Sequence, residues 1–301
     1  LVEVQHHHAH IASVMAEAIA AGQLATDTRV LGIAFDGTGA GTDGTIWGGE
    51  FLVASLDGFE RTAHLLTWAL PGGAASVRDA RRNAFALLSE LGLLEHPGAA
   101  RLLDSLDEQT RSVTATMIER GINSPRTSSM GRLFDAAAAI LGICDKATYE
   151  GEPAIELEAA AWRAFSSESA CPTGNMASFS VTESSRPDDF HVLNSRPLFE
   201  ALLEGIRTGV PAGKLALDFH VTIARASARI ASEICAREGI DIVALSGGVF
   251  MNRLLLRLLT RELKDAGLAV LVPHTVPVND GCIAYGQAAV ARARLTQIAS
   301  R

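Results

Sequence analysis

The sequence predicts an α/β fold, and three observations lead to that class. Short runs of Val, Ile, Leu and Ala alternate along the chain with longer amphipathic stretches of helical periodicity. Two of the apolar runs end in glycine-rich turns, at 30–39 and 241–248, which hints at two related halves. With 301 residues, of which 48% are hydrophobic, the chain can bury one large core or two ordinary ones.

The expected elements can be placed in order along the chain. A helix at about 6–22 carries apolar residues at helical spacing, and strands at 29–35 and 46–54 flank a glycine-rich turn, as in a hairpin. Residues 168–196 are rich in Ser, Thr, Pro and Asp, so we expect a strand pair with irregular loops there, including a short strand at 177–181. The periodicity predicts further helices at 76–95, 99–121, 132–141, 154–167, 215–238, 252–266 and 281–299, and strands at 240–245 and 268–272.

The composition excludes several classes of protein. The net charge is −8 and no basic stripe is visible, so we expect no nucleic acid partner. No run of about 18 apolar residues occurs, so we expect no membrane partner. The cysteines lie far apart without a CxxC pair, which favours a reducing, cytoplasmic location. We expect all four to be small buried apolar residues: Cys144, Cys171, Cys235 and Cys282.

The first predicted helix begins in a cluster of histidines at positions 6, 7, 8 and 10. In a helix, His6 and His10 are four residues apart and lie on one face, where two imidazoles can bind Zn, Fe, Ni or Cu. His7 and His8 project elsewhere, so the cluster should supply two ligands. A histidine-rich surface helix is the alternative, and a metal site needs further ligands from elsewhere in the chain.

Three strand ends carry the other candidates. The stretch 36–39, Asp-Gly-Thr-Gly, can present amides to a phosphate and a carboxylate to a metal, or it is an ordinary hairpin turn. The stretch 246–248, Ser-Gly-Gly, leads into a helix N-terminus, as anion-binding turns do, but it is not a P-loop. In the stretch 279–281, Asn-Asp-Gly, Asp280 can be a ligand or only a helix cap.

These motifs, in this order, resemble those in the C-terminal carbamoyltransferase region of the hydrogenase maturation family HypF. The resemblance spans nearly the whole chain, and its motifs are specific when taken together. The matching stretches are 4–11 (VQHHHAHI), 35–50 (FDGTGAGTDGTIWGGE), 128–135 (SSMGRLFD), 149–151 (YEG), 219–220 (FH), 246–252 (SGGVFMN) and 279–281 (NDG).

The resemblance implies a two-lobed fold of the actin, Hsp70 and sugar-kinase type, with RNase-H-like topology in each lobe. Residues 1–125 would form the first lobe, which carries the histidine helix and lacks its N-terminal hairpin and strands. Residues 126–301 would form the second lobe with the nucleotide cleft, and the last helix would return toward the first lobe.

The resemblance also implies roles for individual residues. A divalent metal, iron or zinc, would be held by His6, His10, Asp36 and Asp280. ATP, AMP or carbamoyl adenylate would be bound by Gly37, Gly39, Asp135, Glu152, Gly247, Gly248 and Asn252. Glu152 stands where the tRNA-modifying relatives of the family have a glycine beside the ribose. The catalytic residues would be Asp36, Thr38 and His10.

The implied reaction is carbamoyl transfer from carbamoyl adenylate to the C-terminal cysteine thiol of a HypE-like partner, on the route to the cyanide ligands of [NiFe] hydrogenase. The adenylate-forming YrdC-like domain of the family is missing from this chain, so we expect only the second half-reaction here. Two alternatives remain open: O-carbamoyl transfer to a small-molecule hydroxyl, and a catalytically silent nucleotide- or metal-binding docking module.

Overall fold

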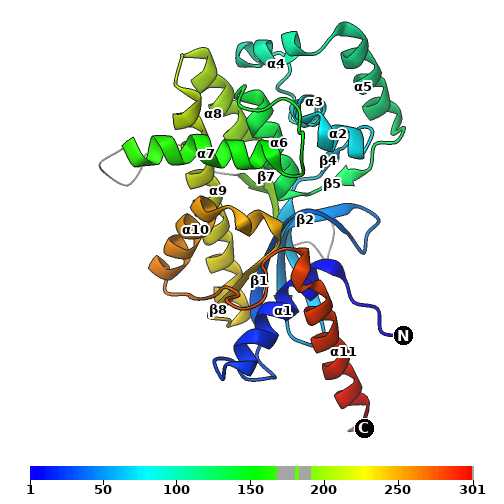
Figure 1. Ribbon diagram of the computed structural model, residues 1–301, viewed down its shortest axis with the longest axis vertical. Coiled ribbons are helices and arrows are strands. Elements are labelled where there is room, and N and C mark those ends of the chain that lie inside the picture. Colours follow the sequence, from blue (N-terminus) through cyan, green and yellow to red (C-terminus); the bar gives the residue numbers. More distant parts are fainter. Residues whose placement is uncertain (168–179, 183–190, 300–301) are drawn as a thin grey trace.

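The computed structural model describes residues 1–167, 180–182 and 191–299 (Figure 1). Its helices are α1 (His6–Ala20), α2 (Ala74–Arg78), α3 (Ala80–Glu90), α4 (Ala100–Ser105), α5 (Glu108–Arg120), α6 (Met130–Ile140), α7 (Glu152–Ser167), α8 (Arg196–Arg207), α9 (Ala212–Glu238), α10 (Arg253–Asp265) and α11 (Ile283–Ala299), with 3-10 turns η1 (Pro97–Ala99), η2 (Gly248–Met251) and η3 (Asp280–Cys282). Its strands are β1 (Val30–Ala40), β2 (Ile46–Ala54), β3 (Phe59–Leu65), β4 (Trp68–Ala69), β5 (Arg126–Thr127), β6 (Ser180–Thr182), β7 (His191–Asn194), β8 (Ile242–Ser246) and β9 (Ala269–Leu271). No helix within the described ranges is long and apolar enough to cross a membrane.

The described strands belong to one mixed sheet whose main order is β6-β7-β3-β2-β1-β8-β9. Strands β1, β2 and β3 form an antiparallel meander, whereas β8 and β9 run parallel to β1. This order is that of an RNase-H-like sheet, as expected. Because β1 pairs with β8, strands from both sides of the predicted boundary at residue 125 share this sheet, and the described residues do not show one separate sheet for each segment.

The sheet is covered on both faces, which explains why β1 is buried along most of its length. Leu31, Ile33 and Phe35 belong to the larger apolar cluster, which also takes in side chains of α6 and α9. Val30 and Ala34 alternate with them and belong to a smaller cluster with α1. Figure 1 shows α1 and α11 against the lower part of the sheet, while α2 to α8 form a mainly helical upper part.

Two glycines allow α1 to approach its neighbours closely. A Cβ on Gly32 of β1 would lie 2.4 Å from Ile11 Cγ1, so the strand lets α1 pack tightly on the sheet. A Cβ on Gly286 of α11 would lie 1.9 Å from the carbonyl oxygen of Ala9, so α11 also packs directly on α1. The loop before α11 is thereby carried to the histidine face of α1.

Most of the predicted helices and strands are confirmed within a few residues at each end, but some differ. The strand predicted at 29–35 continues to Ala40, and the helix predicted at 76–95 is divided at Asp79 into α2 and α3. The helix predicted at 99–121 is two helices, because Asp107 leaves the helical conformation and accepts a hydrogen bond from the Thr110 amide, starting α5 anew. The sequence did not predict β3 or α8. The strand predicted at 177–181 lies partly outside the described residues. Its described part belongs to β6, residues 180–182, which pairs antiparallel with β7.

Candidate metal centre and nucleotide face

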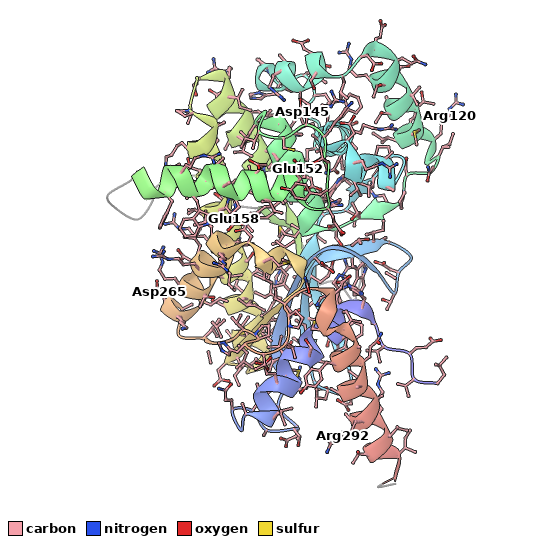
Figure 2. The ribbon with its side chains drawn as sticks, in the orientation of Figure 1. Arg120, Asp145, Glu152, Glu158, Asp265 and Arg292 are labelled. Atoms are coloured by element: carbon pink, nitrogen blue, oxygen red, sulfur yellow. The ribbon has the colours of Figure 1, made fainter. Side chains whose placement is uncertain are left out.

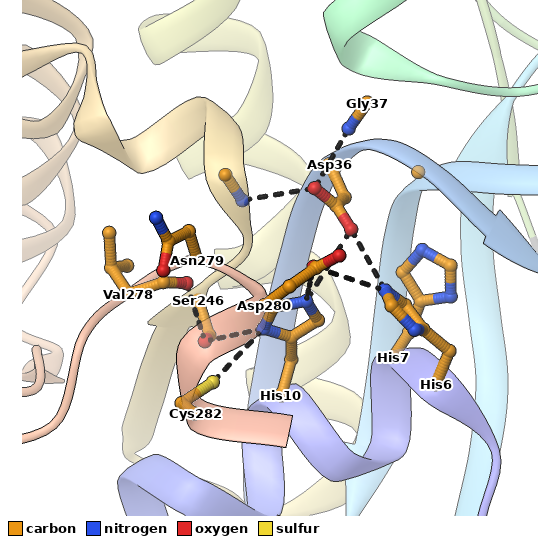
Figure 3. Close-up of polar contacts among 12 residues, drawn as sticks. His6, His7, His10, Asp36, Gly37, Ser246, Val278, Asn279, Asp280 and Cys282 are labelled. Carbon is orange, nitrogen blue, oxygen red and sulfur yellow. Dashed lines mark hydrogen bonds and ion pairs between the residues drawn. The ribbon is translucent and has the colours of Figure 1, made fainter. Parts of the chain in front are cut away.

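Four side chains from three distant parts of the chain converge at the carboxyl end of β1 (Figure 3). One ligand atom from each of His6, His10, Asp36 and Asp280 lies within 4.8 Å of the others. His6 Nε2 is 3.0 Å from Asp36 Oδ2 and 3.6 Å from Asp280 Oδ1. His10 Nε2 is 3.4 Å and 3.3 Å from the same two oxygens. The structure therefore brings together the four residues predicted as metal ligands.

Local structure places the two histidines. Gln5 caps α1 by accepting a hydrogen bond from the His8 amide at 2.8 Å, which starts the helix just before His6. The rings of His6 and His10 then stack edge to face, with centroids 5.0 Å apart. Gly39 leaves room for the His6 ring, because a Cβ there would lie 2.6 Å from His6 Cδ2.

The two carboxylates come from the sheet and from the loop before α11. Asp36 is the last buried residue of β1, and its Oδ1 accepts hydrogen bonds from the amides of Gly37 at 2.8 Å and Gly248 at 3.1 Å. Asp36 Oδ2 is left to face the imidazoles. Asp280 begins η3, which Asn279 caps by accepting a hydrogen bond from the Gly281 amide. Its side chain is 69% exposed, so the cluster is buried on one side and open on the other.

The charges of the cluster favour an ionised aspartate. Burial alone would raise the pKa of Asp36, but the neighbouring His10 and His6 imidazoles hold it well below its ordinary value. Burial opposes protonation of His10, yet the close Asp36 carboxylate raises the pKa of His10 to about 9. His10 Nε2 nevertheless has no hydrogen bond of good geometry among the described residues. Two imidazole nitrogens and two carboxylate oxygens fit iron or zinc, and this buried nitrogen is where a metal ion would bind.

His7 and His8 are not among the four clustered ligands, although the His7 ring packs edge-on against His6 with centroids 5.1 Å apart. Gln5 Nε2 donates to His7 Nδ1 at 3.1 Å, and burial lowers the pKa of His7 to about 4. His8 Nε2 donates to the carbonyl oxygen of Ser55 at 2.8 Å, and its ring packs on Phe59. The cluster of four histidines therefore offers two ligands to the candidate site.

Two further side chains contact His10 from behind. Ser246 Oγ and Cys282 Sγ each lie 3.3 Å from His10 Nδ1, and Figure 3 shows both on the side away from the aspartates. Cys282 is fully buried, and the His10 contact outweighs the effect of burial and lowers the pKa of the Cys282 thiol. Cys282 is therefore buried as predicted, but it also makes a polar contact that the sequence did not indicate. Cys144 is half-buried rather than buried, and Cys171 lies outside the described residues.

The glycine-rich turns form a continuous surface above the metal cluster. Gly247 has φ +110°, and a Cβ there would lie 2.2 Å from the Phe35 carbonyl oxygen, so only glycine fits. A Cβ on Gly131 of α6 would lie 2.8 Å from the Gly37 Cα. The end of β1, η2 and the start of α6 are thus in contact, and Thr38 is exposed beside them.

Asp135 is the least satisfied of the predicted nucleotide ligands. It is 1% exposed, and its Oδ2 pairs with Arg132 Nη2 at 2.9 Å. Its Oδ1 has no hydrogen-bond partner among the described residues. Burial raises the pKa of Asp135 to about 6, although Arg132 opposes this effect.

The other two polar candidates are already engaged within the fold. Asn252 Oδ1 accepts from the Leu255 amide and caps α10, while its Nδ2 donates to the buried His220 Nε2 at 2.9 Å. Glu152 accepts hydrogen bonds from the Thr148 amide and hydroxyl at the start of α7, in the upper part of the molecule (Figure 2). No described contact joins Glu152 to the metal cluster.

Comparisons with known proteins identify the family of this chain. The family model described as carbamoyltransferase, Kae1-like domain, second subdomain, matches residues 32–287. A carbamoyltransferase HypF homolog of Cupriavidus necator is 40% identical over 295 residues, which cover 96% of this chain and 70% of that protein. The carbamoyltransferase HypF of Rhodobacter capsulatus is 36% identical over 98% of this chain, which spans only 36% of its length.

Two solved structures share the fold. Full-length HypF, in a crystal structure of its phosphate- and nucleotide-bound form, matches with a TM-score of 0.86 and 35% identity over 98% of this chain and 36% of its own. The HypF of T. kodakarensis matches with a TM-score of 0.80 and 34% identity over 99% of this chain and 37% of its own. These matches confirm the predicted actin/Hsp70-type α/β class, and the chain belongs to the HypF carbamoyltransferase family.

Proposed function

We propose that this chain transfers a carbamoyl group from carbamoyl adenylate to the C-terminal cysteine of a HypE-like partner, in the synthesis of the cyanide ligands of [NiFe] hydrogenase. The observation that carries the proposal is the convergence of two imidazoles and two carboxylates within 4.8 Å, with Asp36 held in place by the amides of two glycine-rich turns. Such a site can hold a phosphate-bound acyl donor while its bond to phosphate breaks.

The metal in this proposal is iron or zinc, held by His6, His10, Asp36 and Asp280. When bound, it would offset the charge of the departing phosphate and polarise the carbamoyl carbonyl. The open side of the cluster, next to the exposed Asp280, leaves room for a donor to approach.

The nucleotide would lie over the surface that β1, η2 and the start of α6 form together. The free Oδ1 of Asp135 supports a contact with ribose hydroxyls, which can donate to it. Gly37, Gly39, Gly247 and Gly248 would line the phosphate without side chains, with Thr38 beside it; the amides of Gly37 and Gly248 donate to Asp36 and that of Gly247 to the Val278 carbonyl oxygen. Asn252 and Glu152, the remaining predicted nucleotide ligands, already make hydrogen bonds within the protein. A nucleotide would have to bind them in addition to these partners.

The nucleophile in this reaction belongs to the partner. Its thiolate sulfur forms a bond to the carbamoyl carbon, the bond from that carbon to the phosphate oxygen breaks, and AMP leaves with the bonding electrons. Because the acceptor must be a free thiol, we place the reaction in the reducing cytoplasm. Formation of the adenylate is assigned to a YrdC-like domain outside this chain.

The test supplies preformed carbamoyl adenylate and a peptide ending in cysteine to the metal-loaded chain. The expected product is the S-carbamoylated peptide, about 43 Da heavier, together with AMP. Carbamoyl phosphate and ATP alone should give no product. A peptide ending in serine is the matched control: equal modification of it would favour an O-carbamoyltransferase. Absence of AMP release would leave only a docking module.

A further inference from the structure

The ring of His10 is held from both sides. Its Nε2 faces Asp36 and Asp280, whereas its Nδ1 faces Ser246 Oγ and Cys282 Sγ, each at 3.3 Å (Figure 3). The ring itself is fully buried, so water cannot replace a missing partner. Which nitrogen carries the proton therefore depends on these neighbours.

The hydrogen bonds of the neighbouring Ser246 and Ser13 hydroxyls limit which nitrogen of His10 can carry the proton. Ser246 Oγ donates its proton to the carbonyl oxygen of Val278 at 3.4 Å, so it presents only lone pairs to the imidazole. Ser13 Oγ donates to the carbonyl oxygen of His10 at 2.7 Å and offers no proton to the ring either. The sulfur of Cys282 can also accept a proton. Two acceptors thus stand behind Nδ1.

We infer that Ser246 and Cys282 are positioning residues that accept the Nδ1 proton of His10 and so direct its Nε2 lone pair at the metal. This inference rests on the metal centre of the proposed function and assigns the hydrogen-bonded support behind one of its ligands. A histidine ligand whose second nitrogen is held in this way keeps one tautomer and one ring orientation. Ser246 is fixed by β8 and Cys282 by η3, so this support joins the sheet to the segment that carries Asp280.

The experiment measures Zn²⁺ affinity of the full chain by competition with a chromogenic chelator. Ser246→Ala combined with Cys282→Ala should weaken Zn²⁺ binding about 10- to 100-fold, the range typical of such partners. Cys282→Ser in the Ser246→Ala background should restore part of the affinity, because a hydroxyl again accepts the proton. Ser227→Ala and Cys235→Ala, at buried positions outside the cluster, should leave affinity unchanged.

A second readout separates positioning from simple loss of packing. In the zinc-loaded wild type, ¹⁵N spectra of the His10 ring should show a protonated Nδ1 and a metal-bound Nε2. Coordination through Nδ1, unchanged affinity of the double variant, or equal losses in the control variants would overturn the inference while leaving the metal centre intact. Failure of the wild type to bind Zn²⁺ would overturn the metal centre and the inference together.

Discussion

Two buried aspartates near the site have opposite electrostatic properties. Asp36, the last residue of the buried part of β1, is 6% exposed, and its pKa is well below the ordinary value. Asp135, in the middle of α6, is 1% exposed, and its pKa is raised to about 6. Burial is nearly the same for both carboxyls, so burial does not explain the difference.

The number of hydrogen-bond donors explains it. Asp36 receives two backbone amides on one oxygen and faces two imidazoles with the other. Asp135 has one ionic partner, Arg132, and one oxygen without a donor. The fold therefore supplies a fully supported anion where a metal is proposed, and an incompletely satisfied one where a ribose is proposed.

The largest expected effect comes from removing the imidazole that supports Asp36. His10→Ala deletes one of the four proposed ligands and a buried partner of the carboxylate, so Zn²⁺ affinity should fall by more than about 1,000-fold, well beyond the effect of an outer partner. Calorimetry and elemental analysis measure the change. His7→Ala is the matched control, because it removes a neighbouring buried ring that packs on His6 but is not one of the four proposed ligands. Similar losses in both variants would contradict the assignment of His6 and His10 as the two histidine ligands.

The second prediction concerns the pH dependence of stability due to Asp135. Its folded pKa is about 6, above its ordinary value of 3.8, so the folded state binds more protons between these values and stability falls as pH rises through them. Relative to Asp135→Asn, the free energy of unfolding of the wild type should fall by at most about 3 kcal/mol as pH rises from about 4, and the change should be complete by about pH 7. Urea unfolding in EDTA at several pH values measures this difference.

Groups other than Asp135 that titrate in this pH range cancel when the stability of the variant is subtracted from that of the wild type. His7 and His220, whose pKa values burial lowers to about 4, titrate in the same range but are common to both proteins. Asp36 has the opposite sign: the stability that it contributes is present above pH 3.8 and lost below it. A flat difference curve between wild type and Asp135→Asn would contradict the raised pKa of Asp135.

How far the site could be predicted from the sequence depends on how local each contact is. The pairing of His6 with His10 follows from helical spacing, and Asp36 follows from its place at a strand end. The approach of Asp280 requires α11 to pack on α1, which motif resemblance indicated and spacing could not. The inward direction of Cys282 depends on the tight turn of η3 after Asp280, for which the sequence carries no periodic signal.

The same reasoning explains the unpredicted strand β3. Its central residues include Arg61, which breaks the apolar alternation expected of a strand next to a core. Glu50 of the neighbouring strand β2 is completely buried and needs a cationic partner. Arg61 is that partner, and its Nε donates to Glu50 Oε2 at 2.7 Å. A buried ion pair between two strands cannot be deduced from either strand alone.

The smallest expected effect tests the open side of the cluster, through the loop that carries Asp280. The carboxylate of Glu17, on α1, accepts hydrogen bonds from the consecutive amides of His274, Thr275 and Val276, which ties this loop to the helix that bears the histidines. Glu17→Gln keeps the size of the side chain but has only one acceptor oxygen and no charge. Zn²⁺ affinity should therefore fall less than about tenfold, because the other three ligands are untouched and each lost hydrogen bond contributes modestly. Glu3→Gln is a charge-matched control away from this loop. A loss of Zn²⁺ affinity as large as that of His10→Ala would contradict this prediction. It would mean that the loop that carries Asp280 is as important for metal binding as the buried histidine.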